Sequence, residues 1–438
     1  MTTTRSKSLV RTAAKVVVVS TLAVSLGALA AKGGKGGGGG GGGDGGGGGG
    51  GTKLPVASVS ATSLDFGSLQ AGESSSQTVT LSNSSRINLN ISSITVTGSA
   101  AFSSTNDCLA TLAAKARCRI QVTFAPTVGG AAQGSLVIDS NASNSPTAVA
   151  LAGFATQPPT ATVRVEGAGD SIMRGYNADC LGNVSFFDLF CYGLGDQNEH
   201  SFLDGWDADV NSIVDRYKRL DAAASGGKAA SASGSEMRGG GNNFATQAAN
   251  IVASASAPAT VFVELGGNDL CNRSSVADLY TDAQWESAVR AGLDTLTNGL
   301  PDGSSVLLVS VPRVQDLRAV GVSRQQADSR VSCTSFWAAY EVCRIATAGG
   351  TDLAARTAAL DERQNAYNRI LGELATEYNA AADSTGVEVV SEYDPVANAS
   401  AGSFQFQPYD ISGGDCFHPS LQGQNKIAEL VWGNNPYR

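Results

Sequence analysis

The hydrophobic pattern of this 438-residue chain changes once, near residue 157, and that change limits the folds open to it. Before it, short runs such as SQTVTLSN and CRIQVTF alternate apolar and polar side chains with a period of two. After it, short apolar runs such as ATVFVELGG are followed by longer segments in which apolar residues recur every three or four positions. The first pattern is typical of an all-β domain and the second of an α/β domain.

The first 30 residues have the parts of a secretory signal peptide. Four basic side chains precede the apolar stretch VVVVSTLAVSLGALA, and Ala28 and Ala30 offer small residues for cleavage near Ala30. We therefore expect a secreted or extracytoplasmic protein. The stretch is too short for a comfortable membrane span, and no later stretch approaches about 20 apolar residues, so we expect no transmembrane segment in the mature chain.

Residues 31–53 are predicted to form a flexible Gly-rich linker. The run GGKGGGGGGGGDGGGGGGG holds 17 of the 53 glycines of the chain. Glycine has no side chain to bury and loses the most backbone entropy on ordering, so this run cannot build a packed core. It is expected to act as a tether.

Charge and cysteine content narrow the function. Without the four cations of the signal peptide the formal charge falls from −9 to −13, which argues against nucleic acid as a partner. Eight cysteines in an exported chain indicate disulfides, and a zinc site is disfavoured because there is no Cys-x-x-Cys and only two histidines occur. We expect no metal and no organic cofactor. Proximity in sequence suggests the pairs Cys108–Cys118, Cys180–Cys191 and Cys333–Cys343, leaving Cys271 and Cys416.

Residues 54–157 are predicted to form an all-β sandwich. The stretches LDFGSLQAGESSSQTVTLSN and CRIQVTFAPTVGG resemble immunoglobulin-like modules related to those of hydin-type proteins. We expect a spacer, or a module that docks on a partner at the cell surface or envelope. The side chains expected to face its core are Val79, Leu81, Ile120, Val122, Phe124, Leu136, Ile138, Val149 and Leu151.

Residues 160–438 are predicted to form an α/β domain with a parallel sheet. ATVRVEG, ATVFVELGG, SSVLLVSVP and GVEVVSE are short apolar runs typical of buried parallel strands. Helical patterns follow in residues 282–300 and 352–382, the second with an apolar stripe of Leu360, Tyr367, Ile370, Leu371 and Leu374. In open sheets of this kind chemistry lies beyond the carboxyl ends of the strands.

Three stretches at such positions carry reactive side chains. Ser171 follows the first strand in GAGDSIM, GGND at residues 266–269 follows the second, and GGDCFHPS precedes the last helix. A serine nucleophile needs a nearby base, and His418 has Asp415 three residues before it, so that one turn can orient the imidazole toward Ser171. The other histidine, His200, has no carboxylate at a comparable turn and is expected to be an ordinary loop residue.

Acyl transfer also needs hydrogen-bond donors aimed at the developing oxyanion. Asn268 follows two glycines at the end of the second strand, where its amide can point into the site. The N–H of Ser171 is a second candidate because a helix is expected to start there. A glycine N–H is the third, with Gly234 favoured and Gly239 left open.

Together these blocks, GDS, GGNDLC and DCFHPS, resemble the GDSL or SGNH hydrolase family, closest to its phospholipase B-like branch. The resemblance implies a flavodoxin-like three-layer domain with Ser171 as nucleophile, His418 as base and then acid, and Asp415 as its orienting partner. It further implies an oxyanion hole formed by Ser171, Gly234 and Asn268. Met173 and Arg174 follow the serine, and we expect them to line the substrate mouth, although a solvated or salt-bridged Arg174 is the simpler alternative.

The expected activity is hydrolysis of carboxylic esters through an acyl-enzyme, with lipid or phospholipid acyl esters as substrates. A carbohydrate O-acetyl esterase is the main alternative, since the same residues serve both reactions. An alternative of another class is a non-catalytic surface binding or adhesion protein. The presence of every catalytic residue type argues against that alternative.

Overall fold

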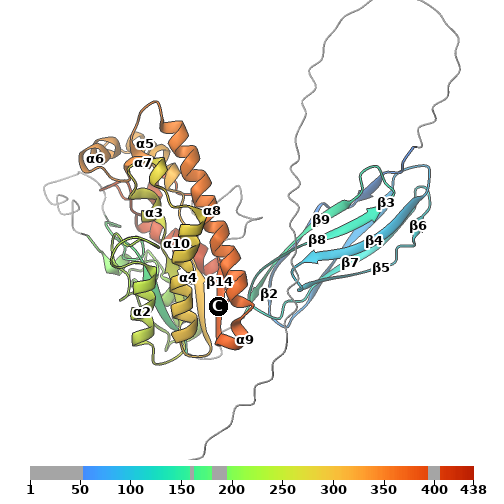
Figure 1. The fold of residues 1–438 in the computed structure, drawn as a ribbon, viewed down its shortest axis with the longest axis horizontal. Helices are drawn as coiled ribbons and strands as arrows, with labels where there is room; N and C mark the ends of the chain where they lie inside the picture. The colour runs from blue at the N-terminus through green and yellow to red at the C-terminus, as the bar shows by residue number, and fades with distance from the viewer. Residues whose placement is uncertain (1–52, 158–161, 180–194, 393–404) are drawn as a thin grey trace, which may run out of the picture. The chain divides into compact units, whose positions relative to one another are not determined.

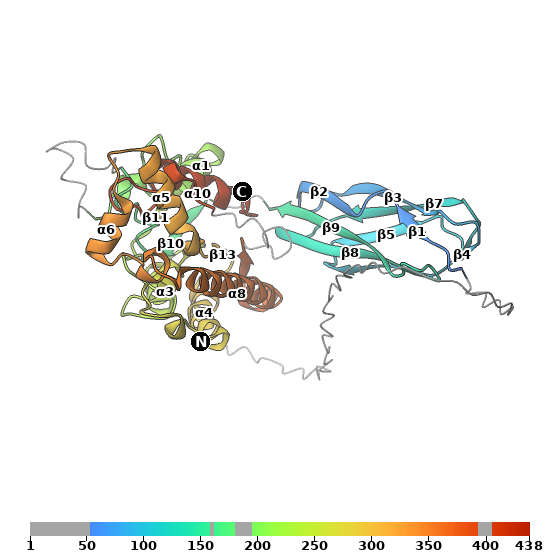
Figure 2. The ribbon, with the colours of Figure 1, turned by 90° about the horizontal axis from the view of Figure 1, so that it is seen from above.

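A computed structural model describes residues 53–157, 162–179, 195–392 and 405–438 (Figures 1 and 2). The predicted signal peptide, nearly all of the predicted linker and the pair Cys180–Cys191 lie outside these ranges. Among the helices of the described ranges, none has the length and apolar character needed to cross a membrane.

The first domain is a β-sandwich of two sheets, as predicted. One sheet has the strand order β1-β3-β7-β5 and the other β2-β9-β8-β4-β6. Neighbouring strands are antiparallel except β2 and β9. The strands are β1 Ala57–Val59, β2 Ser63–Gln70, β3 Ser75–Asn83, β4 Leu89–Gly98, β5 Phe102–Asn106, β6 Thr111–Leu112, β7 Arg117–Phe124, β8 Gly130–Ser140 and β9 Thr147–Thr156.

The core of the sandwich forms from alternate residues of facing strands. All nine side chains predicted to face inward are buried, each with 2% exposure or less. Phe66, Phe102 and Phe124 add a cluster of rings with centroids 5.0–5.8 Å apart. The disulfide Cys108–Cys118 closes the expected short loop.

The second domain is built on a five-stranded parallel sheet, and its order β11-β10-β12-β13-β14 is flavodoxin-like. Its strands are β10 Arg164–Gly169, β11 Ser225–Gly227, β12 Thr260–Glu264, β13 Ser304–Leu308 and β14 Val387–Ser391. The four predicted apolar runs supply β10, β12, β13 and β14. The short edge strand β11 was not predicted, because Ser225–Gly227 has no apolar side chain to signal a strand.

Helices cover both faces of this sheet, which makes three layers. Helices α2, α4 and α8 pack on one face, where Val261 and Val263 of β12 belong to the same apolar cluster as Leu293 and Leu371. Helices α1 and α10 pack on the other, where Phe262 is buried (Figure 2). The helices are α1 Ile213–Leu220, α2 Phe244–Ser254, α3 Gly267–Cys271, α4 Asp282–Gly299, α5 Leu317–Ala327, α6 Cys333–Tyr340, α7 Arg344–Thr347, α8 Leu353–Asn379, α9 Ala382–Thr385 and α10 Leu421–Gly433.

The two long predicted helices form as their apolar spacing indicated. Helix α4 begins at a capping box in which Thr281 and Gln284 satisfy each other's backbone N–H groups. All five residues of the predicted stripe on α8 are buried. Trp285 of α4 stacks on Tyr367 of α8 with ring centroids 4.0 Å apart, which fixes the two helices side by side.

The predicted pair Cys333–Cys343 is wrong. The disulfides are Cys271–Cys343 and Cys333–Cys416, with sequence separations of 72 and 83 residues. Helix α6 begins at Cys333 and ends at Tyr340, before Cys343. The helix therefore separates the two cysteines, and each pairs with a cysteine from another part of the chain. Tertiary packing, and not closeness in sequence, therefore chooses the partners.

Candidate active site

Ser171 lies two residues beyond β10, at the carboxyl end of the parallel sheet. Residues 171–179 form consecutive turns, so the helix expected to start at Ser171 is absent there. Gly175 and Asn177 have positive φ angles of 63° and 52°, which a right-handed helix does not contain. A turn, held by a 3.0 Å bond from the Tyr176 N–H to the Ser171 carbonyl, presents the serine instead.

The structure brings Ser171, His418 and Asp415 into one hydrogen-bonded chain. The Nε2 atom of His418 lies 2.8 Å from the Ser171 Oγ, and its Nδ1 atom lies 2.7 Å from the Asp415 Oδ2. Both distances are those of direct hydrogen bonds. In this arrangement the imidazole can accept the serine proton at one nitrogen while the carboxylate holds the other N–H.

Asp415 is held ionised by the loop around it. Its Oδ1 accepts the backbone N–H groups of Phe417 and His418, at 2.9 and 3.0 Å. Burial acts to raise the pKa of Asp415, but the adjacent His418 and the hydrogen bonds from His418 and Asn177 outweigh it, so the pKa lies below its ordinary value. The carboxylate can therefore orient His418 across the neutral pH range.

Asn177 is a site residue that the sequence analysis missed. Its Nδ2 donates a 2.9 Å hydrogen bond to the Asp415 Oδ2, across 238 positions of sequence. Its side chain is buried, and its left-handed backbone conformation is one that asparagine tolerates better than most residues. An asparagine six residues after a serine carries no recognisable signal in one sequence, because only the fold brings it to Asp415.

Asn268 lies in the first turn of α3 and lines the same pocket as Ser171, as predicted. Both of its amide N–H bonds are engaged: Nδ2 lies 3.0 Å from the Asp170 Oδ2 and 2.9 Å from the Ser235 carbonyl. The amide is thus held in one orientation, with its donors at the floor of the pocket.

A pair of buried carboxyl groups lies beneath the nucleophile. Asp170 directly follows β10 and Glu264 ends the neighbouring strand β12, since Gly169 pairs with Glu264 in the sheet. Burial raises the pKa of Asp170 to about 6, against lowering by the Ile172 N–H and His418. Burial, together with Asp170, holds the pKa of Glu264 well above its usual value. The raised pKa favours the neutral form of Glu264, and a neutral carboxyl group limits the negative charge beneath a developing oxyanion.

Gly234 occupies a turn beside this floor. The Ser235 N–H bonds to the Ala232 carbonyl at 3.1 Å, and Gly234 between them has a φ of +81°, which favours glycine. Among the described residues, neither the Gly234 N–H nor the Ser171 N–H finds a hydrogen-bond acceptor. Gly239 differs, because a Cβ there would lie 2.0 Å from the Glu236 Oε2, so that its place is explained by packing.

The pocket that contains Ser171 is largely apolar. The space between its lining atoms, part of which is open to solvent, is about 420 Å³. Ser171, Asp170, Asn268 and Arg313 supply its polar side chains. Its apolar walls come from Ile172, Pro312, Val314, Leu317, Phe406, Phe417 and Pro419. Such a pocket suits an ester whose acyl group is apolar.

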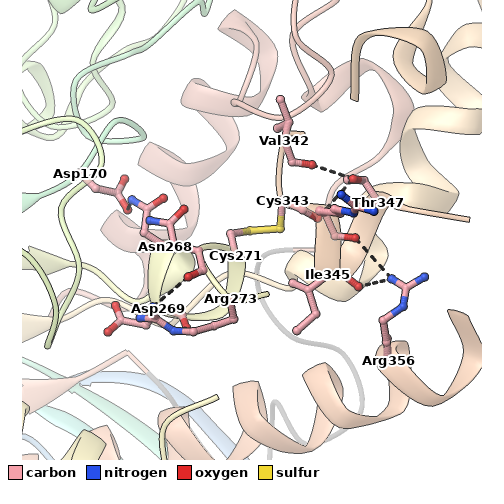
Figure 3. Close-up of a disulfide and its surroundings, with 12 residues drawn as sticks. Asp170, Asn268, Asp269, Cys271, Arg273, Val342, Cys343, Ile345, Thr347 and Arg356 are labelled. Atoms are coloured by element: carbon pink, nitrogen blue, oxygen red, sulfur yellow. Dashed lines mark hydrogen bonds between the residues drawn. A yellow bond between two sulfur atoms is a disulfide. The ribbon is translucent and has the colours of Figure 1, made fainter. Parts of the chain in front are cut away.

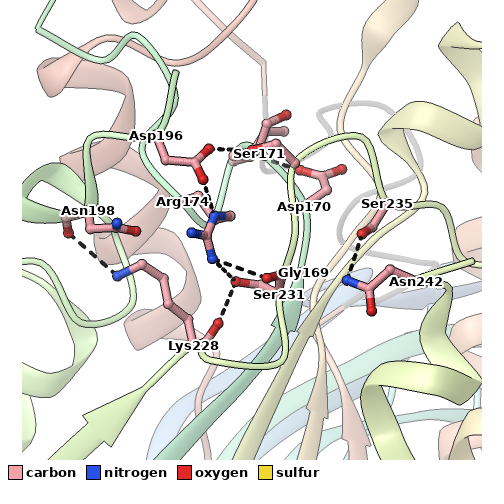
Figure 4. A network of polar contacts seen from close by, with 12 residues as sticks. Gly169, Asp170, Ser171, Arg174, Asp196, Asn198, Lys228, Ser231, Ser235 and Asn242 are labelled. Carbon is pink, nitrogen blue, oxygen red and sulfur yellow. Dashed lines mark hydrogen bonds and ion pairs between the residues drawn. The ribbon is translucent and has the colours of Figure 1, made fainter. Parts of the chain in front are cut away.

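Neither of the two residues expected at the substrate mouth, Met173 and Arg174, lines the pocket of Ser171. Met173 is fully buried in the core between the sheet and α10, because it packs against Gly167 and Gly169 of β10. Arg174 forms an ion pair with Asp196 and donates to the Ser231 carbonyl at 3.1 Å, the salt-bridged alternative (Figure 4).

His200 is not the ordinary loop residue that was expected. It is 8% exposed, and its Nδ1 lies 2.7 Å from a carboxylate oxygen of Asp207. No carboxylate accompanies it at a turn like that of Asp415 and His418, but Asp207, seven residues away, reaches it through the fold. The pocket of Ser171 is not lined by His200.

Two disulfides anchor the site to one helical segment. Cys271 ends α3, which carries Asn268, and its partner Cys343 precedes α7 (Figure 3). Cys416 lies between Asp415 and His418, and its partner Cys333 begins α6. The oxyanion candidate and the Asp–His turn are therefore both tied covalently to residues 333–343.

Within the described ranges, one cluster of potential metal ligands occurs, formed by Asp107, Cys108 and Cys118. Both sulfurs are joined in a disulfide, which removes them as thiolate ligands. The cluster belongs to the β-sandwich and not to the domain of Ser171.

Comparison with known families agrees with this site. Residues 165–431, more than half of the chain, match the family described as GDSL-like Lipase/Acylhydrolase. The chain belongs to this family. Membership supports an ester hydrolase, and the three-layer α/β fold is the one expected for it. The phospholipase B-like branch stays a prediction. No curated protein matches the chain.

The β-sandwich has relatives of its own. Residues 54–156 match the family model of Cep192 domain 4, and the hydin-related type stays a prediction. A protein of unknown function from Porphyromonas gingivalis W83 is 18% identical over 23% of this chain and 47% of its own, with a TM-score of 0.21. This chain thus spans about half of that relative.

Two further solved structures are similar to part of the chain. The ASH/PapD-like domain 7 of human CEP192 is 14% identical over 24% of this chain and 87% of its own, with a TM-score of 0.21. The secreted serine protease VesC of Vibrio cholerae is 20% identical over 24% of each chain, with a TM-score of 0.20. At this distance they say nothing about the activity of this chain.

Proposed function

We propose that this protein is a secreted serine ester hydrolase that acts through an acyl-enzyme on Ser171, with lipid or phospholipid acyl esters as substrates. One observation carries the proposal: the continuous hydrogen-bonded chain from the Ser171 Oγ through the His418 imidazole to the Asp415 carboxylate, with contacts of 2.8 and 2.7 Å. Membership in an acylhydrolase family supports it.

In the first half of the reaction the Ser171 Oγ attacks the ester carbonyl carbon while its proton passes to the His418 Nε2. Asp415 holds the Nδ1–H and stabilises the imidazolium that forms. The carbonyl oxygen becomes an oxyanion, for which the N–H groups of Ser171 and Gly234 are the proposed donors. The amide of Asn268 is the proposed third donor, and to act it must exchange its hydrogen bond to the Asp170 Oδ2 for one to the oxyanion. Collapse of this intermediate breaks the bond to the alcohol, which leaves with the proton from His418.

In the second half water attacks the acyl-enzyme. His418 takes a proton from the water, whose oxygen bonds to the acyl carbon, and then returns the proton to the Ser171 Oγ as the acid departs. In both halves His418 serves first as base and then as acid, so that one side chain carries each proton transfer.

The acyl preference follows from the pocket of Ser171. Its walls are apolar, so an alkyl acyl group gains from leaving water there. This supports lipid-type esters over sugar acetates, whose acyl group is a single methyl. The proposal that the protein is exported rests on the apolar N-terminal stretch, and the three disulfides fit an oxidising compartment. The proposal that it has no nucleic-acid partner rests on its acidic net charge.

The test is hydrolysis of p-nitrophenyl esters from acetyl to palmitoyl by the mature protein. Ser171→Ala should abolish activity at every chain length, whereas the control Ser274→Ala, at an exposed position, should retain it. We expect activity to extend to medium or long acyl groups. Activity confined to acetate would transfer the assignment to a carbohydrate O-acetyl esterase. A folded but inactive wild type would leave the non-catalytic binding protein as the better interpretation.

A further inference from the structure

A second pocket adjoins the Asp–His turn, and the chemistry described above assigns it no ligand. It has an empty volume of about 690 Å³ and shares Phe417 with the pocket of Ser171. Half of its lining residues carry phenyl or phenol rings. They are Tyr176, Phe336, Tyr340 and Phe417, joined by Asn177, Val342, Asp415 and His418.

The rings of this aromatic pocket gather around His418. Tyr176 lies 4.6 Å from the imidazole, between ring centroids, and Phe417 lies 4.8 Å from it, edge to face. Phe336 and Tyr340 form a second pair, 4.5 Å apart, on α6. Ring faces carry negative partial charge, so a cavity walled by several rings attracts a cation.

The polar atoms of the aromatic pocket reinforce this preference. Asp415 contributes an ionised carboxylate, and none of the described lining residues is a lysine or arginine. The pKa of the Tyr176 hydroxyl is raised by burial and by the negative charges of Asp415 and Asp196. Asp196 is neutralised by its ion pair with Arg174 and does not line the pocket, so the negative charge of the pocket wall comes from Asp415.

Asn177 adds an acceptor that has no donor. Its Nδ2 must face Asp415, because the carboxylate can only accept, and this fixes the orientation of the amide. Its Oδ1 is then buried without a hydrogen-bond partner among the described residues, while the residue as a whole is only 4% exposed. Less than 1 Å² of this oxygen is exposed, so it acts on a cation in the pocket through its partial negative charge and not through direct contact.

We propose that the aromatic pocket binds a quaternary or substituted ammonium group in the alcohol part of the ester. The inference rests on the proposed function, in which His418 delivers its proton to the departing alcohol and must therefore lie beside it. Four rings, one carboxylate and one unpartnered carbonyl oxygen suit an ammonium group whose carbons contact the rings. A sugar alcohol would need several free hydrogen-bond donors and acceptors in the pocket wall. The Asp415 oxygens cannot serve as such acceptors, because four hydrogen bonds already occupy them.

Such an alcohol has two sources with the same chemistry: a small choline ester, or a phospholipid with a choline headgroup. The experiment compares butyrylcholine with 3,3-dimethylbutyl butyrate, which replaces the ammonium nitrogen by carbon and keeps the shape. We expect kcat/KM to favour the cationic ester by about tenfold. Tetramethylammonium should inhibit hydrolysis of p-nitrophenyl butyrate competitively, and neopentyl alcohol should not.

Variants locate the effect. Tyr340→Leu and Phe336→Leu should bring the ratio of the two kcat/KM values close to one, because each removes a ring from the aromatic pocket. Trp206→Leu removes a ring that is 72% exposed and lines neither pocket, so the ratio should stay at its wild-type value. A tenfold ratio that persists in both α6 variants would overturn the assignment to this pocket.

The outcomes separate this inference from the function on which it rests. If folded protein hydrolyses neither ester nor any p-nitrophenyl ester, the ester hydrolase proposal fails. If it hydrolyses both butyrates equally well, only the ammonium site is overturned. If the protein cleaves phosphatidylcholine vesicles faster than phosphatidylglycerol vesicles, the ammonium group comes from a lipid headgroup. If it cleaves both kinds of vesicle equally and still prefers butyrylcholine, the ammonium group comes from a small ester.

Discussion

Replacing Asn177 by alanine tests the least expected member of the site. The substitution removes the 2.9 Å hydrogen bond from its amide to the Asp415 Oδ2, inside a region where Asn177 is 4% exposed. It also places alanine, which tolerates a left-handed backbone less well than asparagine does, at a φ of +52°. The two effects are separable, because Asn177→Gly removes the same hydrogen bond and relieves the backbone.

The magnitude follows from these two terms. A hydrogen bond to a charged group contributes about 1.5–3 kcal/mol. The left-handed conformation costs a non-glycine residue about 1–2 kcal/mol, and asparagine less. We expect Asn177→Ala to lower the free energy of unfolding by about 3 kcal/mol. Asn177→Gly should lower the free energy of unfolding by about 1 kcal/mol less than Asn177→Ala. Glycine adopts the left-handed conformation without strain, but its larger entropy in the unfolded chain offsets part of this gain.

The loss should depend on pH in a defined direction. The pKa of Asp415 is lowered in the folded protein, so its contribution to stability is present above the ordinary aspartate pKa and is lost as the pH falls through the lowered value. Without the amide of Asn177 that pKa rises. Both variants should therefore be most destabilised at neutral pH and approach the wild type as the pH falls through the lowered pKa of Asp415.

Urea unfolding at several pH values and kcat/KM on p-nitrophenyl butyrate measure the two consequences. We expect kcat/KM to fall about tenfold in both variants, because His418 loses part of the support for its orientation. Wild-type kcat/KM in Asn177→Gly would refute the claim that this amide positions the Asp–His pair. Equal stability of the alanine and glycine variants would refute the backbone part of the reasoning.

Two other predictions concern stability. The double variant Cys333→Ser, Cys416→Ser opens an 83-residue loop, so we expect it to lower the free energy of unfolding by up to about 4 kcal/mol and to lose ester hydrolysis. The double variant Cys108→Ser, Cys118→Ser, in the sandwich, should keep ester hydrolysis. Equal activity of the two double variants would contradict this prediction. Burial raises the pKa of Asp269 to about 7, so this residue should favour folding at low pH and lose that contribution as the pH rises through that value. Chemical unfolding from about pH 4.5 to about pH 8 should show a shallower decline for Asp269→Asn, and an unchanged slope would count against the raised pKa.

The order of chemistry-bearing residues could be predicted because it depends on local patterns. Buried parallel strands require short apolar runs, and their carboxyl ends meet at one edge, so the sequence pattern alone placed Ser171 and Asn268 together. Asp415 and His418 are three residues apart, and a single turn brings them into contact. These predictions needed only spacing and the direction of strands.

The failures share one cause. Asn177 reaches Asp415 across 238 positions, Cys333 reaches Cys416 across 83, and His200 reaches Asp207 through a loop. Met173 follows the nucleophile in sequence yet turns into the core. None of these contacts has a periodic or local signal, since each depends on where separate elements come to pack.

Local sequence patterns were enough to predict the two domain classes, most of the strands and the long helices, and the residue types that carry acyl chemistry. These follow from hydrophobic period and turn chemistry, which act over a few residues. The tertiary structure alone decided the disulfide partners, the donors that hold Asp415, the acceptors that hold Asn268, and the aromatic pocket beside His418. Such contacts join segments tens to hundreds of residues apart, and only the packed fold sets their distances.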